Sequence, residues 1–397
     1  MSDSSKEKPI HVLTLTPFYP YEENEADGPF VAEPLEHLSK LQITHTVIAA
    51  KPLSHRLIRP TEGFLKPIWV RHLQLPGKAA YGSWGLFMYV RLARMVARLH
   101  RNHKIDIIHA HAALPCGEAA LFLSRQLRIP FVVTTHGVDV LSTGRESGLA
   151  RWWCEKSSRL VYRRTNRNIC VSELSRRRLI NAMGNSIEAN VVYNGVDTDI
   201  FSPSNKIDAP STLTILSVGR LDAIKGQNKV LRAMAGLVAK FPSLRCEIIG
   251  EGTERDRLMA LTRELGIDQR VDMLGVRSRR EVAEAMRRCT VFALPSREEA
   301  LGCVFLEAMA TTKPVIACQG EGIAEIIRHG ENGWLVEQNN PQQLIESLSI
   351  LLEDAELRNR LGQEGRKTIV EGLTLAHQAE RLNRVYRECL KNKVCED

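Results

Sequence analysis

The chain has 397 residues, about twice the length of a typical domain, which predicts two domains. Hydrophobic residues make up 44% and charged residues 25%, so the composition excludes disordered, collagen-like and low-complexity chains. The sequence has no apolar run long enough to span a membrane, no apolar stretch like a signal peptide's near its start, and no CxxC pair among its nine cysteines. We therefore expect a cytoplasmic protein with reduced thiols.

The net charge of +8 is confined to the first half of the chain. Residues 1–205 carry 26 Lys and Arg against 18 Asp and Glu, whereas residues 206–397 carry 28 against 28. A positive field of this kind attracts phosphates or an anionic membrane surface, which would place the protein peripherally on the inner face of a membrane. No known RNA or DNA motif accompanies the basic residues, so a nucleic-acid partner is not expected.

Short apolar runs alternate with helical patterns along the whole chain. The first run, Ile10 to Leu15, predicts a buried strand, and five further strands are predicted at 46–50, 105–110, 130–135, 167–171 and 189–193. A loop-like stretch over 194–211 is interpreted as a linker, after which strands are predicted at 213–218, 245–249, 271–274, 291–294, 314–317 and 333–336. Strands that alternate with helices favour parallel, doubly wound α/β sheets.

This pattern divides the chain into a first domain over residues 1–205 and a second over 206–373. A last helical segment, 374–397, follows the completed second sheet and could cross back to brace the first domain.

Several nucleotide and metal motifs can be set aside. Gly250–Gly252 follows a predicted strand, but Arg255 replaces the third glycine of a dinucleotide fingerprint, and the sequence contains no P-loop. Asp197–Asp199 resembles a metal-binding DxD motif, yet it lies in the linker, where an Asx turn is the alternative. His109 and His111 could be two ligands of a zinc site, but the sequence suggests no third ligand nearby. We expect neither a metal nor a cofactor.

Two cations follow the first strand of the second domain. Arg220 and Lys225 lie in a glycine-bounded segment, Gly219 to Gly226, where that strand meets its loop. Ligands of open α/β sheets bind beyond the carboxyl ends of the strands, so both side chains are placed to hold an anion. Ordinary surface charges are the alternative interpretation of this segment.

A second group of candidate residues follows the predicted strand 291–294. The backbone amides of Gly302, Cys303 and Val304 would begin a helix, and a helix N-terminus is a natural seat for phosphate. Glu299 precedes this turn, and Glu307 interrupts an otherwise apolar helix. Carboxylates would repel a phosphate, so we expect both to accept hydrogen bonds from the hydroxyls of a sugar or ribose.

These residues resemble the retaining glycosyltransferases of the GT-B fold, in particular family four, the glycosyl transferases group 1. The Glu299-x7-Glu307 spacing is similar to the acidic signature of the family, and Gly219-Arg220 with Lys225-Gly226 is similar to its companion motif. Further similar segments are Asn194 to Asp197, Thr135 to Gly137 with Asp139, and Ile169 to Ser172.

The resemblance implies a GT-B fold, with two doubly wound Rossmann-like domains that face each other across a cleft. It implies that Arg220 and Lys225 bind the diphosphate of a nucleotide sugar, with help from the amides of residues 302–304. Glu307 would hold the ribose, Glu299 would hold the donor sugar, and His136 would face that sugar across the cleft. The family often has two glycines after its first strand, whereas here only Gly28, before Pro29, remains, and it is a candidate acceptor-side or phosphate contact.

The function implied is retaining, metal-independent transfer of a hexose-type sugar to a saccharide or lipid-linked acceptor in envelope polysaccharide or glycolipid synthesis. A non-catalytic regulatory or membrane-associated binding subunit of the same fold is the alternative. The predicted helix 84–101 carries apolar residues that include Trp84 and Phe87, and beside them a stripe of arginines. This helix is expected either to dock on anionic lipid or to face the core.

Overall fold

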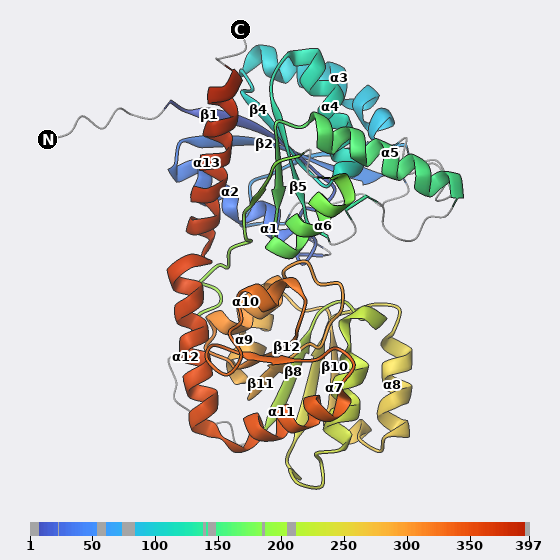
Figure 1. The fold of residues 1–397 in the computed structure, drawn as a ribbon, viewed down its shortest axis with the longest axis vertical. Helices are drawn as coiled ribbons and strands as arrows, with labels where there is room; N and C mark the ends of the chain where they lie inside the picture. Colours follow the sequence, from blue (N-terminus) through green and yellow to red (C-terminus); the bar gives the residue numbers. More distant parts are fainter. Residues whose placement is uncertain are drawn as a thin grey trace, which may run out of the picture. The chain divides into compact units, whose positions relative to one another are not determined.

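The computed structural model describes residues 8–22, 24–53, 61–73, 84–137, 140–141, 148–184, 187–204 and 212–393. These residues form two compact units (Figure 1). The first unit comprises Met1–Tyr193 and Leu375–Asp397, and the second comprises Asn194–Thr374. Asp139 and linker residues 205–211 lie outside the described residues.

The first unit is built on a seven-stranded parallel sheet in the order β3-β2-β1-β4-β5-β6-β7. Its strands are β1 (Ile10–Thr16), β2 (Ile43–Pro52), β3 (Ile68–His72), β4 (Ile107–His111), β5 (Phe131–Thr135), β6 (Arg167–Cys170) and β7 (Ala189–Val191). Strand β3 was not predicted, because it is a short edge strand in which exposed Arg71 interrupts the apolar pattern.

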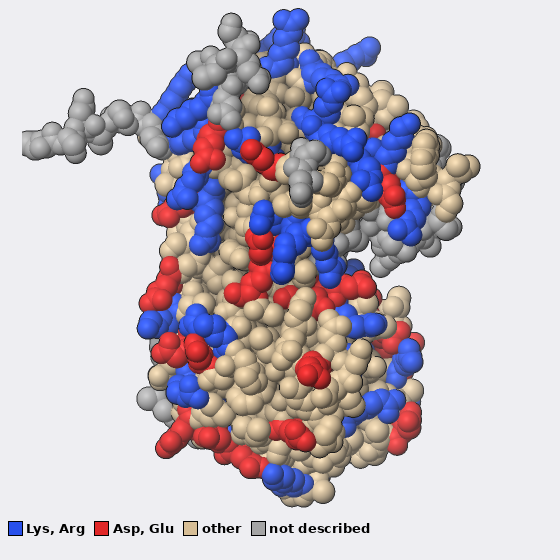
Figure 2. Space-filling model, in the orientation of Figure 1, with Lys and Arg blue, Asp and Glu red and all other residues tan. Residues whose placement is uncertain are grey.

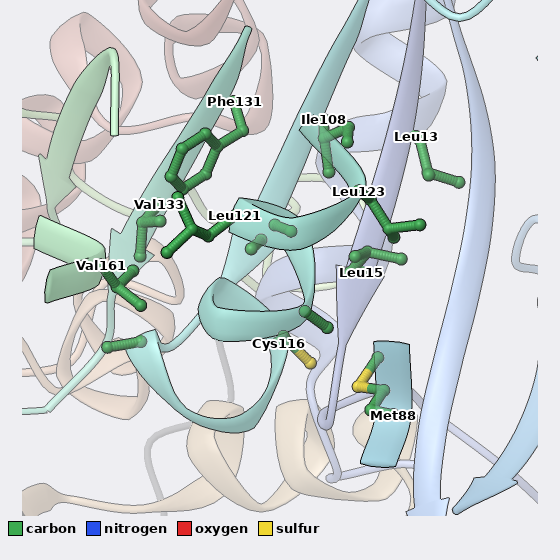
Figure 3. Close-up of a cluster of buried hydrophobic side chains, with 14 of the residues drawn as sticks. Leu13, Leu15, Met88, Ile108, Cys116, Leu121, Leu123, Phe131, Val133 and Val161 are labelled. Atoms are coloured by element: carbon green, nitrogen blue, oxygen red, sulfur yellow. The ribbon is translucent and has the colours of Figure 1, made fainter. Parts of the chain in front are cut away.

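Helices cover both faces of this sheet, as the near-continuous burial of its central strands requires. They are α1 (Pro29–Ala32), α2 (Pro34–Lys40), α3 (Trp84–Asn102), η2 (Ala113–Gly117), α4 (Glu118–Leu127), α5 (Gly148–Arg164), α6 (Glu173–Met183) and α13 (Leu375–Lys393). Residues from α3 to α6 share one core with the sheet, part of which Figure 3 shows around Leu15, Cys116 and Phe131. Residues from α1, α2 and α13 fill the core on the other face.

Helix α3 faces the core on one side. Met88, Leu92 and Val96 are fully buried, so one side of this helix packs in the core. Trp84 and Phe87, the apolar residues beside the stripe of arginines, are both half-buried. The exposed large apolar residues of α3 are Leu86 and Val90.

The second unit is built on a six-stranded parallel sheet in the order β10-β9-β8-β11-β12-β13. Its strands are β8 (Thr214–Val218), β9 (Arg245–Ile249), β10 (Val271–Gly275), β11 (Val291–Ala293), β12 (Val315–Cys318) and β13 (Trp334–Val336). The intervening helices are η3 (Ala223–Lys225), α7 (Gln227–Ala235), α8 (Arg255–Glu264), η4 (Asp268–Arg270), α9 (Arg279–Arg288), α10 (Cys303–Ala310), η5 (Gly322–Glu325), α11 (Pro341–Glu353) and α12 (Ala355–Gly372).

The boundary between the units falls at residue 194, not between 205 and 206 as the loop composition suggested. Phe201 is fully buried, and the Arg279 guanidinium lies 4.9 Å from the centre of its ring. The carbonyl of Ile200 accepts a hydrogen bond from Arg287 at 3.2 Å. These contacts fix the irregular segment to the second unit, because a buried aromatic anchors a chain regardless of its secondary structure.

Helix α13 belongs to the first unit, whereas α12 belongs to the second. Tyr386 on α13 is fully buried, and its hydroxyl lies 2.7 Å from Nδ1 of His109 on β4. The helical segment after the second sheet therefore returns to the first unit (Figure 1). Among the described residues, no helix is both long and apolar enough to cross a membrane.

Candidate active site

The sheet of the second unit reverses its winding between β8 and β11, which are adjacent although β9 and β10 separate them in the chain. Open α/β sheets bind ligands at the carboxyl edge of such a point. Lys225 lies in the loop after β8, and Glu299 lies in the loop after β11. Two predicted site residues 74 positions apart therefore meet at this edge.

Lys225 and Glu299 form an ion pair, with 2.5 Å between Nζ and Oε2. Only 17% of the lysine side chain and 14% of the glutamate side chain are exposed, so water screens the two charges poorly. The ammonium has three N–H donors and can hold the carboxylate and an incoming phosphate oxygen at once. The pair therefore presents a positioned cation and a positioned acceptor side by side.

Close backbone packing brings the two loops together. Gly226 has φ +76°, and a Cβ there would lie 2.4 Å from the carbonyl oxygen of Pro295. The amide of Arg297 donates to the carbonyl of Ile224 at 2.7 Å. Only glycine at position 226 allows the approach that carries Lys225 to Glu299.

Helix α10 begins directly beside Glu299. Its N-cap, Gly302, has φ +80°, and a Cβ there would lie 2.7 Å from the ring of Phe305 and 3.0 Å from Cγ of Glu299. The amides in the first turn of a helix have no acceptor within the helix, and they carry the positive end of its dipole. The first turn of α10, with Cys303 and Val304, is therefore suited to an anion.

Glu321 positions the Glu299 loop, and the sequence analysis missed it. The amide of Glu299 donates to Oε2 of Glu321 at 2.7 Å, and Gly322 donates to the carbonyl of Glu299 at 3.0 Å. Glu321 is buried, and its other oxygen accepts from Gln338. An acidic residue between two glycines directly after a strand was the available signal.

Glu307 is held by a second ion pair that the sequence analysis also missed. Nη1 of Arg279, on the first turn of α9, lies 3.1 Å from Oε1 of Glu307, and both side chains are about nine-tenths buried (13% and 14% exposed). Desolvation raises the pKa of the Glu307 carboxyl, while the nearby Arg279 charge lowers it. Glu307 is therefore a buried, paired carboxylate and not a solvated residue on the surface of the helix.

Arg220 differs from Lys225. Its side chain is 67% exposed and pairs with Asp222 at 3.1 Å. Its carbonyl accepts a hydrogen bond from buried Gln227 at 3.1 Å, which fixes the backbone of the loop. The structure thus brings Lys225, Glu299 and the N-terminus of α10 together. The Arg220 guanidinium is not part of this group and pairs with Asp222 instead.

In the first unit, His136 follows β5 and is stacked on His111, which ends β4. Nδ1 of His111 and Nε2 of His136 are 2.8 Å apart, so one of the two rings donates to the other. Desolvation lowers the pKa of His136 to about 3. The ring is therefore neutral at physiological pH and suited to hydrogen bonding rather than to ion pairing.

The segment that contains Gly28 lies beside His136 in the same unit. Gly28 precedes α1, and the ring of Phe30 in that helix is centred 4.6 Å from the ring of His136. Lys51 at the end of β2 is buried and forms an ion pair with Asp27. The structure therefore gathers Gly28, His136 and a cation that the sequence analysis missed.

The two groups of residues considered for a metal have other partners. Oδ1 of Asp197 accepts from the amides of Asp199 and Ile200 at 2.9 and 3.1 Å, which confirms the Asx-turn interpretation. His109 contacts Tyr386 and Thr134 at 2.7 Å through its two ring nitrogens. Within the described part of the chain, no three His, Cys, Asp or Glu side chains form a group suited to a metal.

Known proteins resemble this chain over both units. The family model described as Glycosyltransferase Family 4 matches residues 30–200, and the model described as Glycosyl transferases group 1 matches residues 201–368. An uncharacterized glycosyltransferase of Methanocaldococcus jannaschii is 31% identical over 71% of this chain and 76% of its own length. N-acetyl-alpha-D-glucosaminyl L-malate synthase of Bacillus anthracis is 26% identical over 78% of this chain and 83% of its own length.

Solved structures share the fold. Sucrose-phosphate synthase from Thermosynechococcus elongatus superposes with a TM-score of 0.78 over 96% of this chain and 100% of its own, at 18% identity. The Anabaena protein HepE, solved in complex with UDP-glucose, superposes with a TM-score of 0.73 over 96% and 100%, at 20% identity. The chain therefore belongs to the family four glycosyltransferases, the glycosyl transferases group 1, and has their GT-B fold of two Rossmann-like domains.

Proposed function

We propose that this protein is a retaining, metal-independent glycosyltransferase. It moves a hexose-type sugar from a nucleotide diphosphate sugar to a saccharide or lipid-linked acceptor. The observation that carries the proposal is the Lys225–Glu299 ion pair beside the N-terminus of α10, at the point where the sheet reverses its winding. That arrangement offers a phosphate-binding cation, helix amides and a hydroxyl acceptor in one place.

The diphosphate of the donor lies against Lys225 and the amides of Gly302, Cys303 and Val304. Arg220 reaches the same diphosphate from its exposed position, exchanging Asp222 for a phosphate oxygen. Glu307 accepts hydrogen bonds from the ribose hydroxyls, held in place by Arg279. Glu299 accepts hydrogen bonds from the hydroxyls of the donor sugar.

The reaction breaks the bond between the anomeric carbon and the diphosphate oxygen, and the electron pair of that bond stays on the diphosphate. Lys225 and the α10 amides are positioned where this charge grows, and preorganised donors of this kind commonly contribute several kcal/mol. The acceptor hydroxyl attacks from the face that the diphosphate leaves, and its proton passes to the departing phosphate. This route retains the anomeric configuration and assigns no nucleophile to the protein.

The first unit supplies the acceptor side. We assign to His136 a hydrogen bond to the donor sugar, and to the Gly28 segment with Lys51 a contact with the acceptor or a phosphate. Residues 51–178 carry 23 basic against 7 acidic side chains, which suits an acceptor held at an anionic surface, as in envelope polysaccharide or glycolipid synthesis. The relatives include enzymes named for transfer to L-malate and to D-inositol 3-phosphate, so the acceptor class varies among them.

Nucleotide binding tests the proposal directly. The purified chain is heated with UDP, GDP, ADP, CDP or dTDP, each with excess chelator, and the midpoint of unfolding is recorded. A ligand that binds only the folded state raises its stability by mass action, so one nucleotide should stand out. UDP is the first candidate, since a protein of the same fold was solved with UDP-glucose.

Variants then place the site. Lys225→Ala and Glu307→Gln should abolish the shift, whereas Lys367→Ala, an exposed lysine on α12, should leave it unchanged. A shift that requires a divalent metal would contradict the metal-independent mechanism. Failure of every nucleotide would instead favour a non-catalytic subunit of the same fold.

A further inference from the structure

Helix α5 exposes an unusual set of side chains to solvent. Leu149 is 84% exposed, Trp152 59%, Trp153 44% and Leu160 41%. Single exposed apolar residues are normal, but four on one helix, two of them tryptophans, form a patch that signals a binding surface. The buried side of the same helix, with Val161 and Tyr162, packs into the core of the first unit.

The four exposed apolar residues of α5 share one face of the helix with three exposed cations. At about 100° per residue, an arc of about 120° contains the whole set. This α5 face consists of Leu149, Trp152, Trp153, Lys156, Leu160, Arg163 and Arg164. The one acidic residue of α5, Glu155, falls outside the arc and pairs with Arg151 at 2.8 Å. The face is therefore apolar toward the beginning of the helix, basic toward its end, and without a carboxylate.

The neighbouring helix α3 repeats this pattern. Leu86 and Val90 are exposed near its start, and four exposed arginines follow: Arg91, Arg94, Arg98 and Arg101. Helix α4 packs against both α3 and α5, and all three contribute to one core on the same side of the sheet. Figure 2 shows the Lys and Arg side chains gathered over the first unit. Two helices on one side of the sheet thus carry apolar residues followed by cations.

We infer that the α5 face, together with the exposed residues of α3, docks on the surface of an anionic lipid bilayer. Tryptophan is suited to the headgroup boundary, because its ring is apolar and its N–H can stay hydrated. Lysine and arginine extend their charges to lipid phosphates while their stems cover apolar area. Nζ of Lys156 lies 4.8 Å from the centre of the Trp152 ring, so a cation–π contact joins a basic and an apolar residue of this face.

The charge pattern favours lipid over a protein partner or a second copy of this chain. A self-interface would place like charges from two copies of α5 close together, since this face has no carboxylate to pair with them. An anionic bilayer offers a continuous negative surface to the three cations of the α5 face and the four exposed arginines of α3. The inference that this surface docks on lipid rests on the proposed function in one respect only. A lipid-linked acceptor would be the reason for the enzyme to bind a bilayer.

Vesicle sedimentation with the full chain tests the inference. Vesicles of phosphatidylcholine alone are compared with vesicles that also contain phosphatidylglycerol, at low and high salt. We expect binding to the anionic vesicles only, and its loss at high salt. Equal binding to both vesicles, or binding to neither, would overturn the proposal.

Matched variants locate the surface. Trp152→Ser with Trp153→Ser, and separately Arg163→Glu with Arg164→Glu, should each weaken binding to anionic vesicles about tenfold or more. Controls in the second unit are Ile350→Ser with Val370→Ser, exposed to a similar degree, and Arg360→Glu with Lys367→Glu, which are also exposed. Binding by the α5 variants equal to that of the controls would contradict a role for α5.

A second measurement does not depend on disruptive variants. Brominated lipids quench tryptophan fluorescence only at close range, so they should quench the wild-type protein far more than the Trp152→Phe, Trp153→Phe variant. Equal quenching of both proteins would place the membrane contact elsewhere. A wild-type dimer that Trp152→Ser with Trp153→Ser converts to monomer in the ultracentrifuge would identify the face as a protein interface and overturn the proposal.

The nucleotide-induced thermal shift separates this inference from the proposed function. If the α5 variants lose vesicle binding and keep the shift, docking and donor binding are both supported and independent. If the wild type shows no shift with any nucleotide yet binds anionic vesicles, the catalytic proposal fails and the docking inference stands.

Discussion

The two units have similar parallel sheets but opposite electrostatics. The first unit carries 31 Lys and Arg against 20 Asp and Glu, a net charge of +11, whereas the second carries 23 against 26, a net charge of −3. The polar interior of the first unit contains a cluster of neutral histidines and one ion pair, Lys51 with Asp27, whereas that of the second contains the ion pairs Lys225–Glu299 and Arg279–Glu307. The same sheet order therefore supports two kinds of chemistry, because the side chains at the strand ends, and not the fold, decide the charge of a site.

The difference follows from what each unit is proposed to hold. A diphosphate needs a fixed cation, and a fixed cation in a protein interior needs a carboxylate to balance it until the ligand arrives. Sugar hydroxyls need neutral donors and acceptors, which desolvated imidazoles supply. The two interiors should therefore respond differently to substitution and to pH.

The largest effect should come from Arg279→Ala in the second unit. The substitution leaves the Glu307 carboxylate buried without its partner, which should lower the free energy of unfolding by about 3–5 kcal/mol. Urea denaturation of the variant measures this loss. The double variant Arg279→Met, Glu307→Leu should recover most of the stability without recovering nucleotide binding, and recovery of both would show that the pair is purely structural.

Lys225→Ala should remove much of the activity while leaving the first unit unchanged. Removing one positioned donor from a developing negative charge typically costs 10²–10³ in kcat, about 2.7–4 kcal/mol. Steady-state kinetics with the matching donor measures the loss. Hydrogen exchange of peptides from β4 and β5 serves as the control, and a change there would mean that the variant perturbs more than the donor site.

Acidification should unfold the first unit before the second. Burial lowers the pKa of His45, His109 and His136 to about 3, against about 6.5 in an unfolded chain. The unfolded state therefore binds more protons, so stability is fully present above pH 6.5 and falls as the pH drops toward 3, by up to about 1.4 kcal/mol per pH unit for each histidine.

Hydrogen exchange between pH 7.5 and pH 5, corrected for the intrinsic rate, measures this effect unit by unit. Peptides from β4 and β5 should lose protection before peptides from β8 and β11, since the second unit contains a single histidine, His329. Simultaneous loss of protection in both units would contradict the division drawn here.

The smallest effect should come from His136→Ala. The loss of the hydrogen bond that we propose between this ring and the donor sugar should lower kcat/KM about tenfold. His103→Ala, an exposed histidine in the same unit, should leave kcat/KM unchanged. If His136→Ala keeps full activity while the nucleotide shift persists, the histidine cluster serves stability alone.

Much of the fold could be predicted from the chain because local patterns encode it. The twelve expected strands all overlap strands of the structure, and only β3, at a sheet edge and interrupted by Arg71, escaped notice. The boundary between the units was predicted after residue 205, whereas the second unit begins at residue 194. Loop composition does not reveal that Phe201 is buried, and this burial fixes an irregular segment to the second unit.

The candidate site was predictable in part. Lys225, Glu299 and the start of α10 stood out, since a cation after a strand and a glycine before a helix are local signals. Arg279 and Glu321 did not stand out, because each looks like an ordinary charged residue until its buried partner is known.

The sequence by itself determined the alternation of strands and helices, the glycines that permit close turns, and the excess of positive charge in one half. Only the tertiary structure decided which charges meet: Lys225 with Glu299, and Arg279 with Glu307. It also decided that Tyr386 reaches His109 across 277 positions of the chain. The physical reason is that hydrophobic periodicity is a local property, whereas partners across a sheet are set by strand order and by the burial that this order creates.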